Sequence, residues 1–200
     1  MFRRILAAAA LLIVASCASR PPDESGYMNR IAADRASKDT VFGDSATPIP
    51  FDAHARFLPL GYFPIDSAFV VPASFTEDPP GARPRMEMQT SAHQPRLMER
   101  VGTLAFTLQG QALRLSAFRE VGEATDRLFV PFTDLTTGQQ TYAAGRYLDI
   151  ARSPTGIYVV DFNLAYNPYC YYNPTYDCPY PPKENRLPVA ITAGEKTTRK

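Results

Sequence analysis

Residues that alternate between large apolar and smaller or polar side chains predict β structure in the middle of the chain. Apolar side chains occupy every second position over residues 104–108 and again over 113–117, and Gly110-Gln111 can form a turn between these runs. Successive side chains of a strand point to opposite faces of a sheet. The pattern therefore predicts a β-hairpin.

Shorter segments of the same kind recur along the chain, with turn residues between them. They are residues 69–71, 86–90, 98–101, 128–132, 141–148, 157–162 and 189–192. Strands that follow one another without intervening helical patterns favour an antiparallel sandwich or a partly open barrel. The predicted fold class is mostly β.

Two segments before the first strand follow other patterns. Residues 27–39 begin with apolar side chains three or four positions apart, which predicts a short helix packed as an arm on the domain. From Phe51 to Val71, prolines punctuate short apolar pieces such as Phe57-Leu58-Pro59-Leu60. Proline disfavours helix, so we expect extended edge segments or loops in this region.

The last third of the chain is rich in tyrosine and proline. Of the eleven tyrosines, nine lie from Tyr142 onward, and six of these lie between Tyr166 and Tyr180. Prolines crowd the same stretch and exclude regular secondary structure there. Because tyrosine combines a large apolar ring with a hydroxyl that needs a partner, we expect a long, rigid aromatic loop floored by the sheet.

The first residues predict export from the cytoplasm. Arg3 and Arg4 precede a run of eleven apolar residues, 5–15, without any charge. At about 1.5 Å per residue this run is too short to cross a hydrocarbon core of roughly 30 Å. A basic pair followed by a short apolar run is typical of a cleaved signal peptide.

The end of the apolar run, Val14-Ala15-Ser16-Cys17, resembles the lipobox of bacterial lipoproteins. The resemblance implies cleavage before Cys17 and several acyl chains, palmitate among them, on that cysteine, which together give stable membrane anchoring. The alternative is an ordinary secretory peptide with an incidental cysteine. Ala18 stands where aspartate usually retains lipoproteins on the inner membrane. This favours the outer membrane and a domain facing the periplasm, with the inner membrane or the cell surface as alternatives.

The length and net charge of the chain limit its domain organisation and its possible partners. Cleavage removes two arginines, so the 21 basic and 20 acidic residues of the whole chain leave a mature chain near −1. Such a balance excludes nucleic acid and lipid head groups as main electrostatic partners. We expect a signal peptide over residues 1–16, a lipidated tether over 17–25, one β-rich domain over 26–196 and a tail over 197–200.

A series of unusual motifs in the second half carries a family resemblance. The motifs, in order, are Asp134-Leu-Thr-Thr-Gly138, Gly145-Arg146-Tyr147, Asp161-Phe162-Asn163, Ala165-Tyr166-Asn167-Pro168, Cys170, Cys178-Pro179, Glu184-Asn185-Arg186-Leu187-Pro188 and Ala193-Gly194-Glu195-Lys196. The chain resembles the bacterial family of unknown function numbered 1684 over roughly residues 27–196. The resemblance implies a shared architecture and brings no activity with it.

Cys170 and Cys178 are candidates for a disulfide. Export places them in an oxidising compartment, where a bridge across the aromatic loop would contribute about 2.5 kcal/mol. The alternative is a pair of free thiols that binds a metal or takes part in redox chemistry. Members of the resembled family that look cytoplasmic and keep both cysteines support this alternative. A closed zinc site needs four ligands, and His54 and His93 lie far away in sequence. We therefore predict neither a metal site nor a cofactor.

Polar side chains bracket the aromatic loop and are the candidate binding residues. They are Asp161, Asn163, Tyr166, Asn167, Asn185 and Arg146. Carboxylate and carboxamide groups on one strand face could orient a hydroxylated ligand or a hard cation such as calcium. The alternative, which a proline-rich loop favours, is that these groups cap turns and satisfy backbone atoms. Arg146 would then pair with Asp161 or Glu184.

Two function classes follow from these residues. The first is a binding or scaffold module whose tyrosine-lined groove holds a small polar ligand or a peptide. The second is a hydrolase-type enzyme that uses Asp161 or Glu184 as a general base, alone or with a metal. No nucleophile elbow, phosphate-binding glycine loop or zinc-protease motif supports the second class. Glu195-Lys196, at the end of the last predicted strand, is expected to be solvated.

Replacing the lipidation site tests the anchor. Cys17→Ser should release the protein from the membrane fraction or leave an unprocessed precursor, because the acyl chains that hold it are attached to the cysteine sulfur and amine. Globomycin should likewise accumulate the precursor, and fractionation with immunoblotting reports both effects. Unchanged processing and membrane association under both treatments would remove the lipoprotein assignment.

Overall fold

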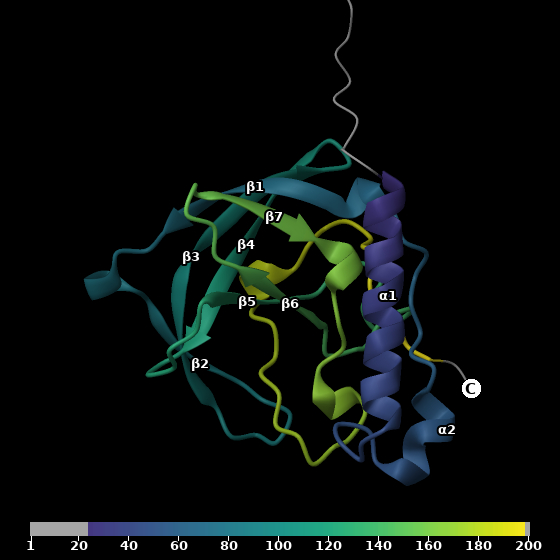
Figure 1. The fold of residues 1–200 in the computed structure, drawn as a ribbon. Coiled ribbons are helices and arrows are strands. Elements are labelled where there is room, and N and C mark those ends of the chain that lie inside the picture. The colour runs from purple at the N-terminus through teal and green to yellow at the C-terminus, as the bar shows by residue number, and fades with distance from the viewer. Residues whose placement is uncertain (1–23, 199–200) are drawn as a thin grey trace, which may run out of the picture.

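Seven antiparallel strands form one curved sheet in the computed structural model, which describes residues 24–198 (Figure 1). Hydrogen-bonded neighbours follow the order β6-β5-β4-β3-β1-β7, and β2 pairs with the first residues of β3. The strands are β1 Val70–Glu77, β2 Arg85–Met88, β3 Arg96–Leu108, β4 Gln111–Glu120, β5 Arg127–Phe132, β6 Arg146–Ala151 and β7 Ile157–Asp161. The mostly β, antiparallel fold class predicted from the alternating pattern is confirmed.

The two end strands of the sheet almost meet, so the sheet approaches a closed barrel. Tyr147 in β6 and Tyr166, which follows β7, exchange both backbone hydrogen bonds, at 2.9 and 3.0 Å. Beside this bridge, a shallow groove of about 390 Å³ separates β6 from β7. The Tyr147–Tyr166 bridge thus closes the barrel at one end of the seam.

The predicted hairpin is formed by β3 and β4. Leu104 lies opposite Leu115, and both side chains are fully buried. The turn lies one residue earlier than expected, at Gln109-Gly110, where both residues have positive φ. Two successive positive φ values match the twist of the flanking strands, and glycine adopts them readily.

Helices lie on the outside of the barrel. The long helix α1 (Glu24–Gly43) runs along one side of it (Figure 1) and extends beyond the predicted residues 27–39 at both ends. Its first two residues belong to the expected tether; the rest of that tether, the signal peptide and Cys17 lie outside the described residues. The short helix α2 (His54–Phe57) lies where extended structure was expected, and it ends before the Leu58-Pro59 pair because the residue before proline disfavours helix.

Single 3-10 turns make up the remaining regular structure. They are η1 Phe51–Ala53, η2 Ser67–Phe69, η3 Pro80–Ala82, η4 Phe162–Leu164, η5 Tyr169–Tyr171 and η6 Lys183–Asn185. The aromatic loop therefore contains only such turns, as its prolines predicted.

The last part of the chain is buried although it is not a strand. Residues 189–192 were predicted to be a strand, and the prediction is wrong, yet Val189, Ile191 and Ala193 belong to the barrel core at 0–3 % exposure. Similarly, the predicted strand 141–148 begins only at Arg146. Alternation in residues 189–193 reflects burial of every second side chain without pairing to a neighbouring strand. Thr197 and Thr198 of the expected tail still donate backbone hydrogen bonds to the body of the protein.

Arg146 fixes this last segment in place. Its guanidinium donates to the carbonyl oxygens of Ile191 at 2.8 Å, Ala193 at 2.5 Å and Glu195 at 3.0 Å. Its ionic partner is Asp134, at 3.0 Å, and both side chains are completely buried. Burial lowers the pKa of Arg146, and the charge of Asp134 opposes this effect. The arginine therefore replaces the ladder hydrogen bonds that a strand would have supplied.

The expected partners of Arg146 were different. Asp161 instead accepts hydrogen bonds from Tyr27, and Glu184 is exposed on η6. Asp134 also accepts from the backbone of Thr136 at 2.7 Å, in the turn where Thr137 N–H bonds the Asp134 carbonyl. The prediction that Arg146 pairs with Asp161 or Glu184 is therefore wrong. The ion pair that Arg146 does form is nevertheless structural, as expected.

Removing the Arg146 charge should destabilise the whole domain. Arg146→Met leaves the Asp134 carboxylate buried without a counter-ion and three carbonyls without donors, so we expect a loss of about 3–5 kcal/mol in urea unfolding. Arg114→Met, which removes an exposed arginine on β4, is the matched control and should change stability by less than about 0.5 kcal/mol. Equal stability of the two variants would contradict the role given to Arg146.

Candidate functional site

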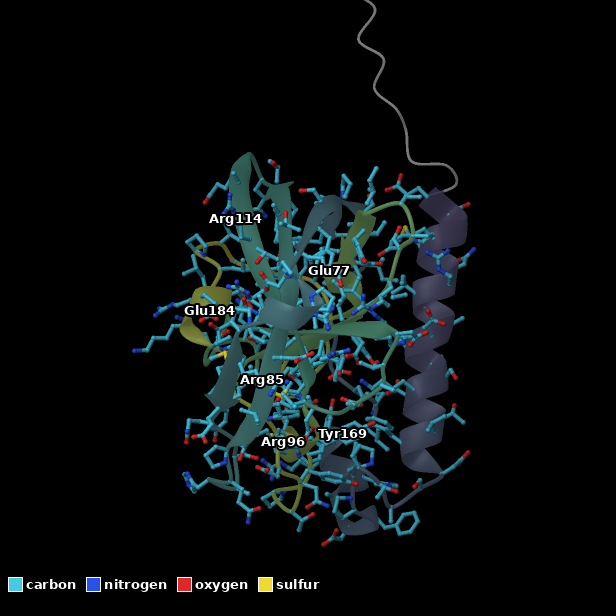
Figure 2. All side chains as sticks on the ribbon, turned by 90° about the vertical axis from the view of Figure 1, so that its left-hand side faces the viewer. Glu77, Arg85, Arg96, Arg114, Tyr169 and Glu184 are labelled. Carbon is cyan, nitrogen blue, oxygen red and sulfur yellow. The ribbon has the colours of Figure 1, made fainter. Side chains whose placement is uncertain are left out.

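A groove of about 520 Å³ with many aromatic side chains lies beside the Tyr147–Tyr166 bridge. Helix α1, strands β3, β5 and β6, and the tyrosine-rich loop all contribute to it, through Lys38, Phe42, Arg96, Phe129, Tyr147, Asp149, Tyr166, Pro168, Tyr169, Tyr176, Asp177, Cys178 and Pro179. We call it the aromatic groove. Arg96 and Tyr169 lie at the same level of the molecule in Figure 2. Its volume is within the range of small-molecule sites.

Edge-to-face packing orders the tyrosine rings of the groove. The ring centroids of Tyr147 and Tyr166 are 5.7 Å apart, and those of Tyr169 and Tyr176 are 5.3 Å apart. Phe129 packs on Tyr147 in the same manner at 4.8 Å. Such arrangements are favoured by the ring quadrupoles, so the groove is preformed.

The four tyrosine hydroxyls differ in their partners. Tyr147 donates to the carbonyl of Pro179 at 2.5 Å, and Tyr166 donates to Asp149 at 2.7 Å. Burial raises the pKa of both tyrosines far above the ordinary value, so both stay protonated. Within residues 24–198, the hydroxyls of Tyr169 and Tyr176 have no hydrogen-bond partner, and Tyr169 is 44 % exposed. These two hydroxyls are free to bond a ligand.

The charged residues of the groove are paired with other residues of the protein. Lys38 forms an ion pair with Glu195. Arg96 donates to the Asp177 carbonyl at 2.7 Å and lies 3.7 Å from the carboxylates of both Asp177 and Glu120. The groove therefore offers aromatic faces and hydroxyls, while its positive charges are already neutralised.

The role of Glu195 was not apparent from the sequence. It was expected to be solvated, but it is 1 % exposed, so that expectation is wrong. Its carboxylate accepts from the Asn167 backbone at 2.8 Å and from the Tyr172 hydroxyl at 2.6 Å, in addition to the ion pair with Lys38. Burial and the negative charge of Glu195 both raise the pKa of Tyr172. Glu195 thus joins α1, the loop and the C-terminal segment behind the groove.

Asp161 and Asn163 serve the backbone of a neighbouring segment. The Asn163 carboxamide accepts from Asp66 N–H at 3.0 Å and donates to its carbonyl at 2.8 Å. Asp161 caps the η4 turn through Asn163 N–H at 2.9 Å and binds the Tyr27 hydroxyl of α1. The pKa of Tyr27 is raised by burial and by the Asp161 charge. Both side chains are therefore committed to the fold.

Asn185 substitutes for a missing strand pairing. Between β4 and β5 the described pairing is confined to Phe118 with Phe129, because Pro131 has no N–H. The fully buried Asn185 carboxamide fills this gap: it accepts from Ser116 N–H at 2.7 Å and donates to the carbonyls of Ser116 and Pro131 at 2.9 and 2.7 Å. It acts as a peptide group of the sheet.

Of the six residues predicted to bind a ligand, the structure places one in the aromatic groove, namely Tyr166. Asn167 lies behind it, where its backbone binds Glu195 and its buried Oδ1 has no partner among the described residues. The two general bases of the hydrolase alternative do not come together: Asp161 holds α1, whereas exposed Glu184 lies on η6 (Figure 2). The described residues contain no cluster of three or more metal ligands.

Lys38, Phe42, Arg96 and Phe129 are groove residues that the sequence did not reveal. They lie on α1, β3 and β5, far from the loop in sequence, and each looks like an ordinary helix or strand residue. The concentration of tyrosines was the signal that did indicate this region. The two cysteines also lie here, as free thiols, and the predicted bridge stays a prediction.

Comparison with known proteins gives the chain its family. A family model described as protein of unknown function DUF1684 matches residues 55–196. The chain belongs to this family. Among solved structures, it resembles the solution NMR structure of the uncharacterised protein from gene locus rrnAC0354 of Haloarcula marismortui, with 37 % identity and a TM-score of 0.68, over 88 % of this chain and 96 % of the other. No curated protein matches this chain.

The function of the family is unknown, in agreement with the resemblance noted from the motifs, so the comparisons assign no molecular function to the chain. In the described part of the chain, no helix has the length and apolarity needed to span a bilayer.

The structural role of Asn185 can be measured. Asn185→Ala leaves three buried backbone groups unpaired, so we expect a loss of about 3 kcal/mol or more and a melting temperature lower by roughly 6–12 °C. Asn173→Ala is the matched control because Asn173 bonds only exposed loop groups. Circular dichroism melts compare the two variants, and unchanged stability of Asn185→Ala would contradict the peptide-like role.

Proposed function

We propose that the protein is a lipid-anchored periplasmic lipoprotein, on the outer membrane, that binds a small neutral, hydroxylated ligand such as a short saccharide in the aromatic groove. The observation that carries the binding proposal is the preformed groove of about 520 Å³, in which the hydroxyls of Tyr169 and Tyr176 have no hydrogen-bond partner among the described residues. The export signal and Cys17 support the anchor and the compartment.

The composition of the groove favours a neutral ligand. Lys38 and Arg96 are neutralised by Glu195, Asp177 and Glu120, so an anionic ligand would have to displace an existing ion pair. Aromatic faces offer apolar contact to the C–H faces of a sugar ring, and phenolic hydroxyls bond its hydroxyl groups.

The backbone around the groove argues for a saccharide over a peptide. A peptide that binds as an added strand needs an unpaired strand edge. Next to the groove, Tyr147 already pairs with Tyr166, and Tyr180 N–H bonds the Gln89 carbonyl at 2.7 Å. Recognition must therefore come from side chains, which suits a ligand whose polar groups surround a compact ring.

Tyrosine fluorescence measures binding directly because the chain contains no tryptophan. Titration with tri-N-acetylchitotriose and with cellotriose should change the emission of the parent protein. Tyr169→Ala and Tyr176→Ala should each weaken binding about tenfold, which is roughly 1.4 kcal/mol, because each removes one ring face and one hydroxyl.

Tyr180→Ala is the matched control for this experiment. Tyr180 is exposed and belongs to the same loop, but it does not line the groove. Its replacement should leave the affinity unchanged. Binding of neutral tripeptides in place of both saccharides would contradict the saccharide assignment, and a Tyr180 effect as large as that of Tyr169 would contradict the location.

A further inference from the structure

Two thiols are in contact at one end of the aromatic groove. The Cys170 N–H donates to the Cys178 sulfur at 3.2 Å, and the two thiol groups are also hydrogen bonded to each other. Cys178 is 7 % exposed and lines the groove, whereas Cys170 is half-buried. Cys170 is thus the more exposed residue of the pair, and Cys178 is the one that borders the groove.

Hydrogen-bonding groups surround the sulfur of Cys170. Hydrogen bonding from the Cys178 thiol and the Tyr142 hydroxyl outweighs the burial of Cys170 and lowers the pKa of this thiol to about 7. The pKa of Cys178 moves upward because of its bond to Cys170 and its burial. Cys170 is therefore the thiol of the pair that ionises more readily.

The surroundings hold the two sulfurs in this arrangement. Ser91 accepts from Cys178 N–H at 3.0 Å and donates its own backbone N–H to the Cys178 carbonyl at 3.0 Å. The other ionisable groups that face the pair are Tyr142, Tyr147 and Arg96. Burial raises the pKa of both tyrosines, so neither ionises near neutral pH.

We propose that Cys170 and Cys178 form a redox-active dithiol that exchanges electrons with the disulfide bond of a substrate. A nucleophilic thiol that is accessible and a resolving thiol that is buried are the two parts that such exchange requires. The bridge predicted from the sequence is then the oxidised form of the pair.

The exchange has two steps. The Cys170 thiolate attacks one sulfur of the substrate disulfide, forms a mixed disulfide and releases the other substrate sulfur as a thiolate. Cys178 then attacks the Cys170 sulfur, its proton passes to the departing substrate sulfur, and the Cys170–Cys178 bond forms. The protein loses two electrons, one substrate sulfur leaves as a thiol, and the other, released as a thiolate, takes a proton from water. The reverse sequence oxidises a substrate dithiol.

This reaction is independent of the saccharide proposal because it needs only the two sulfurs and an accessible path to Cys170. The groove adds an apolar surface next to the reacting sulfurs. Tyr169 and Tyr176, which face each other in the groove, immediately precede Cys170 and Asp177-Cys178 in the loop, so a substrate at Cys170 lies beside their rings.

Alkylation by iodoacetamide tests the nucleophile. In the reduced full-length protein, the rate at the Cys170 peptide, read by mass spectrometry, should be half-maximal near pH 7. At pH 7 it should exceed the rate of an ordinary thiol of pKa 9 about fivefold, because a roughly fiftyfold larger thiolate fraction outweighs a tenfold lower nucleophilicity. Tyr142→Phe should move the midpoint to higher pH. A midpoint at the ordinary thiol value would overturn the proposal.

Trapping experiments test the order of the two thiols. With oxidised glutathione, Cys178→Ser should accumulate a mixed disulfide on Cys170, whereas Cys170→Ser should react at least tenfold more slowly. The parent protein should form the Cys170–Cys178 bond and release it again in reduced glutathione. A bridge that glutathione cannot reduce would identify a purely structural disulfide, and preferential trapping on Cys178 would reverse the assigned roles; either result would overturn the proposal.

Discussion

The completely buried ion pair between Arg146 and Asp134 is the interaction on which the rest of the structure depends. A buried charge pair is tolerated only when its remaining donors and acceptors are satisfied. Here the two terminal nitrogens of the guanidinium bind three carbonyls of the C-terminal segment, and Asp134 also binds Ile191 N–H at 3.2 Å; among the described residues the arginine Nε alone has no partner in this network. The pair thereby specifies where a segment without strand pairing must lie, and it seals the barrel core.

Placement of the C-terminal segment determines the position of Glu195, and Glu195 in turn determines the groove. Its carboxylate reaches Lys38 on α1 and Tyr172 in the loop. Two elements at opposite ends of the chain, together with the aromatic loop, are therefore held against one side of the barrel by a single buried carboxylate. Lys38 also lies 5.2 Å from the ring centroids of Phe42 and Tyr166, so the same contact helps to fix two groove side chains.

Local patterns in the sequence predicted the local structure well. The β3–β4 hairpin and the irregular, tyrosine-rich loop follow from alternation and proline content, which act over a few residues. The segment 189–192 has the alternation of a strand, but its hydrogen-bond partners are the side chains of Arg146 and Asp134 and the Leu135 backbone N–H, which no local pattern encodes. Glu195 resembled a solvated residue near the C-terminus because its partners Lys38 and Tyr172 are remote in sequence.

The candidate site was predictable in its region and less so in its members. Carboxamides near a proline-rich loop suggested both ligand binding and backbone capping, and in this structure Asn163 and Asn185 have all their polar atoms in contact with backbone. Their commitment to the fold has a chemical consequence. With these carboxamides and the groove cations occupied, the described groove still offers ring faces, the hydroxyls of Tyr169 and Tyr176, and Cys178, whose sulfur accepts from the Cys170 N–H. The recognition chemistry of this surface is thus limited to contacts with apolar ring faces, neutral hydrogen bonding and thiol exchange.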